Sequence, residues 1–348
     1  MKKKKNRLII LSIIIVVIMI VLGMIIFKLE NHDIKKSTEK HEIIKKERPK
    51  KIQIIDLNSK TRPIAVMINN VDTVWGYQSG LQDAYLVYEI IVEGGYTRLM
   101  ALFKDKSIDR IGTVRSARHY FLDYALENDA IYVHFGWSPQ AQSDISLLGV
   151  NNINFMTFDE GYIRDYSINL ASEHTVFTST NQIINGIEKY GYNKESNQSN
   201  LLNYSADEVD LSKLDGNSIA NKVIIPYSYL KSTSYEYDNF NKVYKRFQND
   251  IEHIDYVTKQ QYTVKNIIVY QVNNHLISND DKGRQTIDNI GSGDGFYISN
   301  GYSIPITWEK NARESKTVYR YLNGQEIKVN DGNTYIQIMP SDQNLSIS

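Results

Sequence analysis

Arginine and histidine side chains are concentrated in one stretch of the sequence, residues 111–123. Arg115 and Arg118 lie three positions apart there, and His119 follows directly. If a helix begins near Ser116, both arginines lie on one face of its first turn. Free backbone N–H groups and the positive end of the helix dipole favour anions at such a position. Two guanidinium groups would add bidentate binding of phosphate or carboxylate, and His119 a titratable donor.

Further polar residues that could line this site occupy strand ends and turns, where functional groups are often found. The segment Glu93-Gly94-Gly95 predicts a tight turn whose glycines permit close approach of a ligand to the backbone. If the protein catalyses a reaction, the candidate acid–base residues are Asp83, Glu93 and His119. The candidate ligand-binding residues are Arg115, Ser116, Arg118, His119, Arg98, Glu93, His134, Gln140 and His174.

A structural role is the alternative explanation of the two arginines. Glu89, Glu93, Asp123 and Glu127 are close enough in the sequence to bind them in internal ion pairs. His134 lies in an expected strand, where a histidine is more often a hydrogen-bonded core residue than a ligand. The residue types alone leave the anion site and the structural network both open.

The composition excludes several classes of site. The 348 residues include no cysteine, which rules out disulfides, thiolate metal sites, cysteine nucleophiles and a lipid-modified cysteine. The seven histidines lack the spacing of a zinc site, and there is no phosphate-binding glycine loop, so no metal and no cofactor are expected. The formal net charge is zero, so the chain has no general attraction to nucleic acid.

The N-terminal sequence predicts a membrane anchor. Residues 1–28 comprise a basic tip and an apolar run over residues 8–27, and a run of about 20 such residues spans a bilayer. No small-residue cleavage site follows the run, which favours an uncleaved signal anchor, a single transmembrane helix. The flanking lysines would keep the N-terminus in the cytoplasm and leave the bulk of the chain extracytoplasmic. Residues 29–60 then form a polar stalk.

The elements expected beyond the stalk divide into two kinds. Residues 61–192 alternate short apolar strands with helices near residues 116–128, 139–148 and 180–190, which is typical of an α/β domain. Residues 193–218 are rich in Asn, Ser and Asp and are interpreted as a linker. Residues 219–342 predict a mostly antiparallel β domain, with hairpin signals such as Asn323-Gly324.

Several of these segments resemble the YerB-like family of bacterial exported proteins, known as domain of unknown function 3048. The resemblance covers roughly residues 60 to 340, and its most specific part is the Arg115-Ser-Ala-Arg118 block with its neighbours. Members are commonly lipoproteins with a lipidated N-terminal cysteine. This chain has no cysteine, so the resemblance implies the same side of the membrane with a different anchor. It implies no activity.

Three functions remain open on these observations. The leading hypothesis is a non-catalytic cell-envelope protein, held at the cell membrane by its single helix, that binds a phosphate-bearing wall or lipid ligand at Arg115 and Arg118. The second is an enzyme acting on phosphate-linked envelope polymers. The third is a scaffold for envelope proteins whose partner the sequence does not identify.

Overall fold

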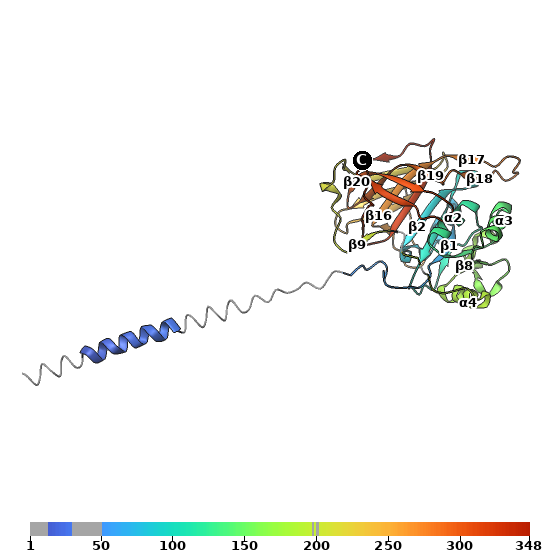
Figure 1. Ribbon diagram of the computed structural model, residues 1–348. Helices are drawn as coiled ribbons and strands as arrows, with labels where there is room; N and C mark the ends of the chain where they lie inside the picture. The colour runs from blue at the N-terminus through green and yellow to red at the C-terminus, as the bar shows by residue number, and fades with distance from the viewer. Residues whose placement is uncertain (1–12, 30–50, 197, 200–201) are drawn as a thin grey trace, which may run out of the picture. The chain divides into compact units, whose positions relative to one another are not determined.

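The computed structural model describes residues 13–29, 51–196, 198–199 and 202–348 (Figure 1). Residues 13–29 form a helix. Within the described part of the chain, no helix is long and apolar enough to cross a membrane. Residues 8–12 of the expected anchor and residues 30–50 of the expected stalk lie outside the described residues. Residues 51–348 form one compact unit.

An 11-stranded sheet runs through the compact unit and takes strands from both halves of the chain. Its order is β10-β20-β19-β16-β23-β2-β3-β1-β5-β6, with β21 added beside β20. The strands are β1 (Ile64–Asn70), β2 (Leu86–Ile91), β3 (Thr97–Phe103), β5 (Ile131–His134), β6 (Asn152–Asn154), β10 (Ser218–Ile219), β16 (Asn266–Val272), β19 (Gly291–Ser299), β20 (Tyr302–Lys310), β21 (Val318–Tyr321) and β23 (Thr334–Pro340).

The two halves of the chain meet inside this sheet. β2 pairs in parallel with β23, in a register that runs from Leu86 opposite Thr334 to Ile90 opposite Ile338. Both strands are buried along their whole length, because each has a strand on either side and side chains packed on both faces. The residues expected to form a linker include β9 (Tyr204–Ser205), a 3-10 turn (Leu211–Lys213) and the edge strand β10. The expected boundary at residues 193–218 therefore does not coincide with a boundary between two sheets.

A second sheet of six strands packs on one face of the long sheet. Its strands are β11 (Lys222–Pro226), β12 (Ser232–Asp238), β13 (Val243–Gln248), β14 (Ile251–Glu252), β15 (Thr263–Val264) and β24 (Ser346–Ile347). Inward-facing Val223, Tyr235 and Tyr244 share a buried cluster with Val66 and Val87 of the long sheet. The pairing within this sheet is antiparallel, as the alternating sequence predicts.

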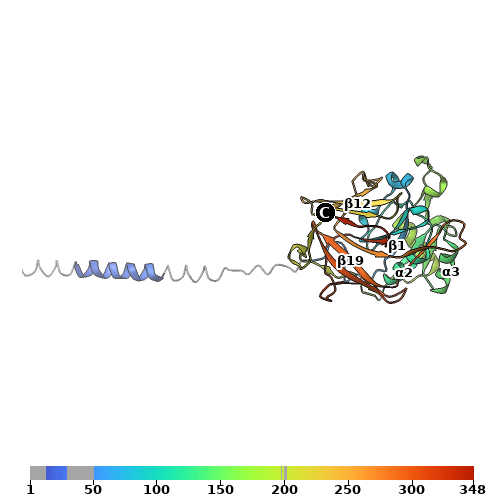
Figure 2. The same ribbon diagram turned by 90° about the horizontal axis from the view of Figure 1, so that it is seen from above.

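Three helices cover the N-terminal part of the long sheet (Figures 1 and 2). α2 (His119–Glu127) and α3 (Pro139–Leu147) pack on one face, and α4 (Thr180–Tyr190) packs on the other. α3 begins as expected, because Ser138 accepts a hydrogen bond from the Ala141 backbone and Pro139 is the first helical residue. α4 ends as expected at Gly191, whose φ of 66° is left-handed.

Three small sheets of short strands complete the described part of this unit. β4 (Ile111–Gly112), β8 (Val176–Thr178) and β7 (Ile163–Arg164) form a three-stranded sheet. β17 (Asn274–Leu276) and β18 (Gln285–Ile287) form a hairpin, and β9 pairs with β22 (Val329–Asn330). The predicted combination of an α/β first part and an antiparallel β second part is confirmed at this level, although one continuous sheet joins them.

Candidate functional site

The expected position of Arg115 in a helix is wrong. α2 begins at His119 with Arg118 as its N-cap, three residues later than the periodicity predicts. The preceding segment is extended, because its backbone is hydrogen-bonded to neighbouring strands. The Arg115 N–H donates to the Met67 carbonyl at 2.9 Å, and the Ala117 N–H donates to the Gly136 carbonyl at 2.9 Å. Arg115 and Arg118 therefore do not share a helical turn.

The turn between β2 and β3 supplies a carboxylate to this segment. Glu93 opens the turn, and Gly94 and Gly95 follow with φ values of 71° and 75°, a left-handed conformation that favours glycine. The Glu93 carboxylate accepts hydrogen bonds from Arg98 on β3 at 3.0 Å and from Arg118 Nε at 2.9 Å. The Glu93-Gly94-Gly95 turn thus places the Glu93 carboxylate next to the guanidinium groups of Arg98 and Arg118.

Arg98 and Arg118 bind this carboxylate and its charge also acts on Arg115, and we call Glu93, Arg98, Arg115 and Arg118 the arginine cluster. Arg98 also donates to the Ser116 carbonyl at 2.5 Å, and Arg118 to the Ala117 carbonyl at 2.8 Å. Among the described residues, no ion pair or hydrogen bond joins Arg115 to a carboxylate. Its guanidinium donates to the Glu173 backbone carbonyl at 3.1 Å and is only half-buried.

The charges of the arginine cluster do not balance. Burial raises the pKa of Glu93, but the charges of Arg98 and Arg118 outweigh burial and hold that pKa at about 2. Burial, together with the charge of Arg118, lowers the pKa of Arg98 to about 9. Burial also lowers the pKa of Arg115, where the Glu173 carboxylate opposes and Arg118 reinforces the effect. Three guanidiniums and one carboxylate give the four residues of the cluster a formal excess of two positive charges, and the nearby Glu173 carboxylate offsets part of it.

Two histidines lie near arginines of the cluster, His174 near Arg115 and His119 near Arg118. His174, in the 3-10 turn Ser172–His174, accepts a hydrogen bond at Nδ1 from the Asn69 side-chain amide at 2.9 Å. Burial and the charge of Arg115 lower its pKa. His119 is buried, its Nε2 lies 3.1 Å from the Thr286 hydroxyl in β18, and burial lowers its pKa to about 4. Both rings are therefore neutral at pH 7.

The remaining sequence candidates lie apart from the cluster. His134 is fully buried in β5, and its Nδ1–H donates to the Gly136 carbonyl at 2.8 Å. Gln140 is exposed in the first turn of α3. Asp83 is exposed in the 3-10 turn Leu81–Asp83, and among the described residues no hydrogen bond or ion pair joins its carboxylate to the cluster. His134 thus fits the core interpretation.

The acidic residues considered as internal partners of the arginines have other partners, except Glu93. Asp123 binds Arg313 at 2.6 Å, and Glu127 binds Lys310 at 2.8 Å. Both contacts tie α2 to segments from the second half of the chain. The structural network predicted as the alternative for Arg115 and Arg118 therefore holds for Arg118, through Glu93, and does not hold for Arg115.

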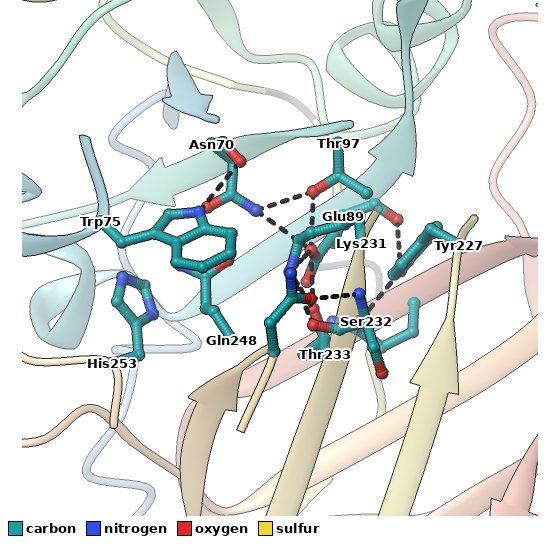
Figure 3. Close-up of polar contacts among 12 residues, drawn as sticks. Asn70, Trp75, Glu89, Thr97, Tyr227, Lys231, Ser232, Thr233, Gln248 and His253 are labelled. Carbon is teal, nitrogen blue, oxygen red and sulfur yellow. Dashed lines mark hydrogen bonds and ion pairs between the residues drawn. The ribbon is translucent and has the colours of Figure 1, made fainter. Parts of the chain in front are cut away.

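A second polar cluster, which the sequence analysis missed, lies wholly inside the protein (Figure 3). Glu89 of β2 binds Arg246 of β13 at 2.7 Å and lies 3.5 Å from the Lys231 ammonium. All three side chains are fully buried, and we call them the buried ionic centre. Hydroxyl and amide groups complete the coordination of Glu89, namely those of Asn70, Thr97 and Thr233.

The buried ionic centre joins the two large sheets. Burial raises the pKa of Glu89, but the charges of Arg246 and Lys231 outweigh it and hold that pKa at about 2. Burial and the charge of Arg246 lower the pKa of Lys231 to about 7, although the Glu89 carboxylate opposes the shift. The sequence does contain a signal for Arg246: it lies two residues from Tyr244 and from Gln248, on the inward face of an alternating strand.

Metal binding has no support in the described part of the chain. No group of three or more histidine, aspartate or glutamate side chains is arranged there to hold an ion. The chemistry that the arginine cluster offers is the binding of an anion.

The sequence and the fold of this chain are similar to those of known proteins. The N-terminal domain of the "Protein of unknown function (DUF3048)" family matches residues 53–193, and its C-terminal domain matches residues 223–336. "Putative lipoprotein YerB" of Bacillus subtilis is 29% identical over 303 residues, which cover 83% of this chain and 85% of that protein. The crystal structure of YerB from Bacillus subtilis superposes with a TM-score of 0.73 at 28% identity, over 86% of this chain and 99% of that chain. The chain belongs to the DUF3048 family.

Proposed function

We propose that this protein is a non-catalytic, extracytoplasmic component of the cell envelope that binds a phosphate-bearing ligand at Arg115. The observation that carries the proposal is the unequal pairing of the arginine cluster. Glu93 binds Arg98 and Arg118, whereas Arg115 donates to one backbone carbonyl and stays partly exposed. A guanidinium has five N–H donors, so Arg115 retains donors for an incoming anion.

The surroundings of Arg115 favour an anion rather than a neutral ligand. The excess of two positive charges in the cluster attracts negative charge, and burial of Arg98 and Arg118 limits screening by solvent. Ser116 is half-buried beside Arg115 and carries a hydroxyl donor. A phosphate group matches the planar fork of a guanidinium bidentately.

The cell envelope is the proposed location for two reasons. The basic residues before the apolar run at residues 8–27 favour an uncleaved anchor with a cytoplasmic N-terminus. The relative YerB is described as a lipoprotein, which supports the same side of the membrane for this chain. Because the chain has no cysteine, the apolar N-terminal segment would replace a lipid as its anchor.

The acid–base candidates offer little support for catalysis. Glu93 has a pKa of about 2 and binds two guanidiniums, so it neither donates nor accepts a proton readily at neutral pH. His119 faces Thr286, and Asp83 is exposed elsewhere. A buried carboxylate within reach of both Arg115 and Arg118 would favour an enzyme acting on phosphate-linked polymers. Glu93 binds Arg118 and its charge acts on Arg115, so this enzyme is the second candidate.

Calorimetric titration of residues 51–348 with pyrophosphate and with glycerol-phosphate oligomers tests the proposal. Replacing Arg115 with alanine should weaken binding by about tenfold or more, because charged hydrogen bonds are lost. Arg320→Ala is the matched control, since Arg320 also donates to a backbone carbonyl, that of Gly324, but lies in β21. Equal binding by wild type and Arg115→Ala, or no binding by the wild type, would refute the anion site and favour the scaffold hypothesis. Turnover of the oligomers would favour the enzyme.

A further inference from the structure

A cavity of about 330 Å³ lies between the sheet and α4, and no residue of the arginine cluster lines it. Its floor is made by three apolar residues at the ends of adjacent strands. Ile64 of β1 pairs in register with Phe103 of β3 on one side and with Ile131 of β5 on the other. Since neighbouring strands lie about 4.8 Å apart, the floor is a continuous apolar strip about 10 Å wide.

One wall of the cavity is also apolar. Ile184 and Ile187 of α4 lie three residues apart, so they project from the same side of the helix. Ile187 is buried, but Ile184 is 37% exposed. The fold therefore leaves part of this apolar wall in contact with solvent.

The rim of the cavity is basic. Four basic residues and one acidic residue line it, namely Arg62, Lys104, Lys106, Lys194 and Asp105. Lys106 is exposed, and within the described residues its ammonium has no hydrogen-bond or ion-pair partner.

The other three basic residues already have partners. Arg62 binds Asp129 at 3.0 Å, and Lys194 binds Glu188 at 2.7 Å. Lys104 donates to the Ser59 carbonyl at 2.9 Å. Lys106 is thus the cation available to a ligand, next to an uncovered apolar surface.

We propose that this cavity binds a single-chain amphiphile with a phosphate head group. The chain would lie on the strip formed by Ile64, Phe103 and Ile131, and the phosphate would contact Lys106 at the rim. A volume of about 330 Å³ is at the small end of the range for small-molecule sites, which suits one chain rather than a folded partner. The site is separate from the arginine cluster, so the two proposals can fail independently.

Titration of residues 51–348 with dodecyl phosphate, below the concentration at which it forms micelles, tests this inference. Two probes serve as controls: dodecyl maltoside has the same chain without charge, and inorganic phosphate has the charge without a chain. Dodecyl phosphate should bind at least about tenfold more tightly than either. Equal affinity for dodecyl maltoside, or binding only to anionic vesicles and not to the monomer, would overturn the proposal.

Substitutions at the wall and the rim of the cavity test whether dodecyl phosphate binds there. Ile184→Glu places an acid on the apolar wall and Lys106→Glu reverses the rim charge, and each should weaken dodecyl phosphate binding by about tenfold. Leu147→Glu in α3, at a residue that is 78% exposed, is the matched control and should leave binding unchanged. All three sites are exposed, so thermal melting should show retained folds. Unchanged affinity in both Ile184→Glu and Lys106→Glu would show that the amphiphile does not occupy this cavity.

Discussion

Arg115 differs from Arg98 and Arg118 in the partner of its guanidinium. A carboxylate neutralises part of the charge of the other two, whereas in the described part of the chain Arg115 has the backbone carbonyl of Glu173 as its hydrogen-bond partner. The difference arises from the backbone: residues 115–117 are hydrogen-bonded in an extended conformation before α2 begins, which directs Arg115 to the turn at residues 172–174. Binding and structural roles are therefore divided among arginines that look equivalent in the sequence.

Glu93→Gln distinguishes a binding site from a catalytic one. The substitution removes the single negative charge of the arginine cluster, so pyrophosphate affinity should rise by up to about tenfold. The free energy of unfolding should fall by about 1–3 kcal/mol, because Arg98 and Arg118 lose a charged acceptor. Calorimetry and urea denaturation measure the two effects. Loss of pyrophosphate binding in a folded Glu93→Gln protein would contradict the assigned role.

His134 should contribute to unfolding in acid. Burial lowers its pKa to about 4, compared with 6.5 for a free imidazole, although bonds to Gly136 and Asn152 oppose the shift. The unfolded chain therefore binds a proton between pH 6.5 and pH 4 that the folded protein does not, and stability falls by about 3 kcal/mol as pH drops through this window. In His134→Gln, the difference in unfolding free energy between pH 7 and pH 4 should shrink by that amount. The exposed His275→Gln is the control, and equal pH profiles in all three proteins would exclude this role.

The site residues could be predicted only in part from the sequence. The clustering of Arg98, Arg115 and Arg118 could be suspected from their positions at strand ends and turns. Which of these arginines bind Glu93 and which contacts Glu173 could not be predicted. The answer depends on where α2 begins and on contact with a loop that follows about 60 residues later in the chain. His119 was misleading for a related reason: its partner Thr286 belongs to the second half of the chain.

At the scale of elements, the buried ionic centre fixes how the six-stranded sheet sits on the long one. β2 supplies Glu89, and Lys231 directly precedes β12 (Figure 3). β13 supplies Arg246. A slip of one residue in β13 would turn Arg246 to the opposite face and leave the carboxylate without its main partner. The centre therefore specifies one register of the two sheets.

Glu89→Gln should lower the free energy of unfolding by about 3–5 kcal/mol, because it leaves the Arg246 guanidinium buried without a counter-charge. Glu236→Gln is the matched control, since Glu236 of β12 binds Lys222 at 2.9 Å at the surface, and little change is expected. Urea denaturation at pH 7 compares the two variants. Similar, small losses in both would show that the buried ionic centre does not stabilise the packing of the sheets.

Helices whose ends are marked by capping residues in the nearby sequence could be predicted most accurately. α3 and α4 follow from Ser138-Pro139 and from Gly191, whose effects act within a few residues of the chain. The start of α2 could not be placed, because hydrogen bonds to Met67 and Gly136 compete with the helix over residues 115–117. The parallel pairing of β2 with β23 joins residues about 250 apart, and no local pattern encodes it.

At the scale of the whole molecule, residues 51–348 should unfold as one unit. β2 lies between β3 and β23, so removing either half of the chain exposes a buried central strand. The Asp123–Arg313 and Glu127–Lys310 pairs tie α2 to the second half as well. The two family domains are therefore parts of one sheet-based core.

A fragment of residues 51–218 tests this expectation. It lacks β23 and the whole six-stranded sheet, so it should show no dispersed amide spectrum and no cooperative thermal transition. In the intact unit, hydrogen exchange in β1–β3 and in β19–β20 should report similar free energies of opening. A stably folded fragment, or two separate unfolding transitions of the intact unit, would show that the halves are independent domains.

The most direct test of the central claim is a crystal structure of residues 51–348 soaked with pyrophosphate. We expect a phosphate group within about 3 Å of the Arg115 guanidinium, with Glu93 still bound to Arg98 and Arg118. The same soak of Arg115→Ala should show no ligand there. Pyrophosphate absent from Arg115 in the wild type, or bound equally well in the variant, would contradict the assignment of this arginine as the anion site.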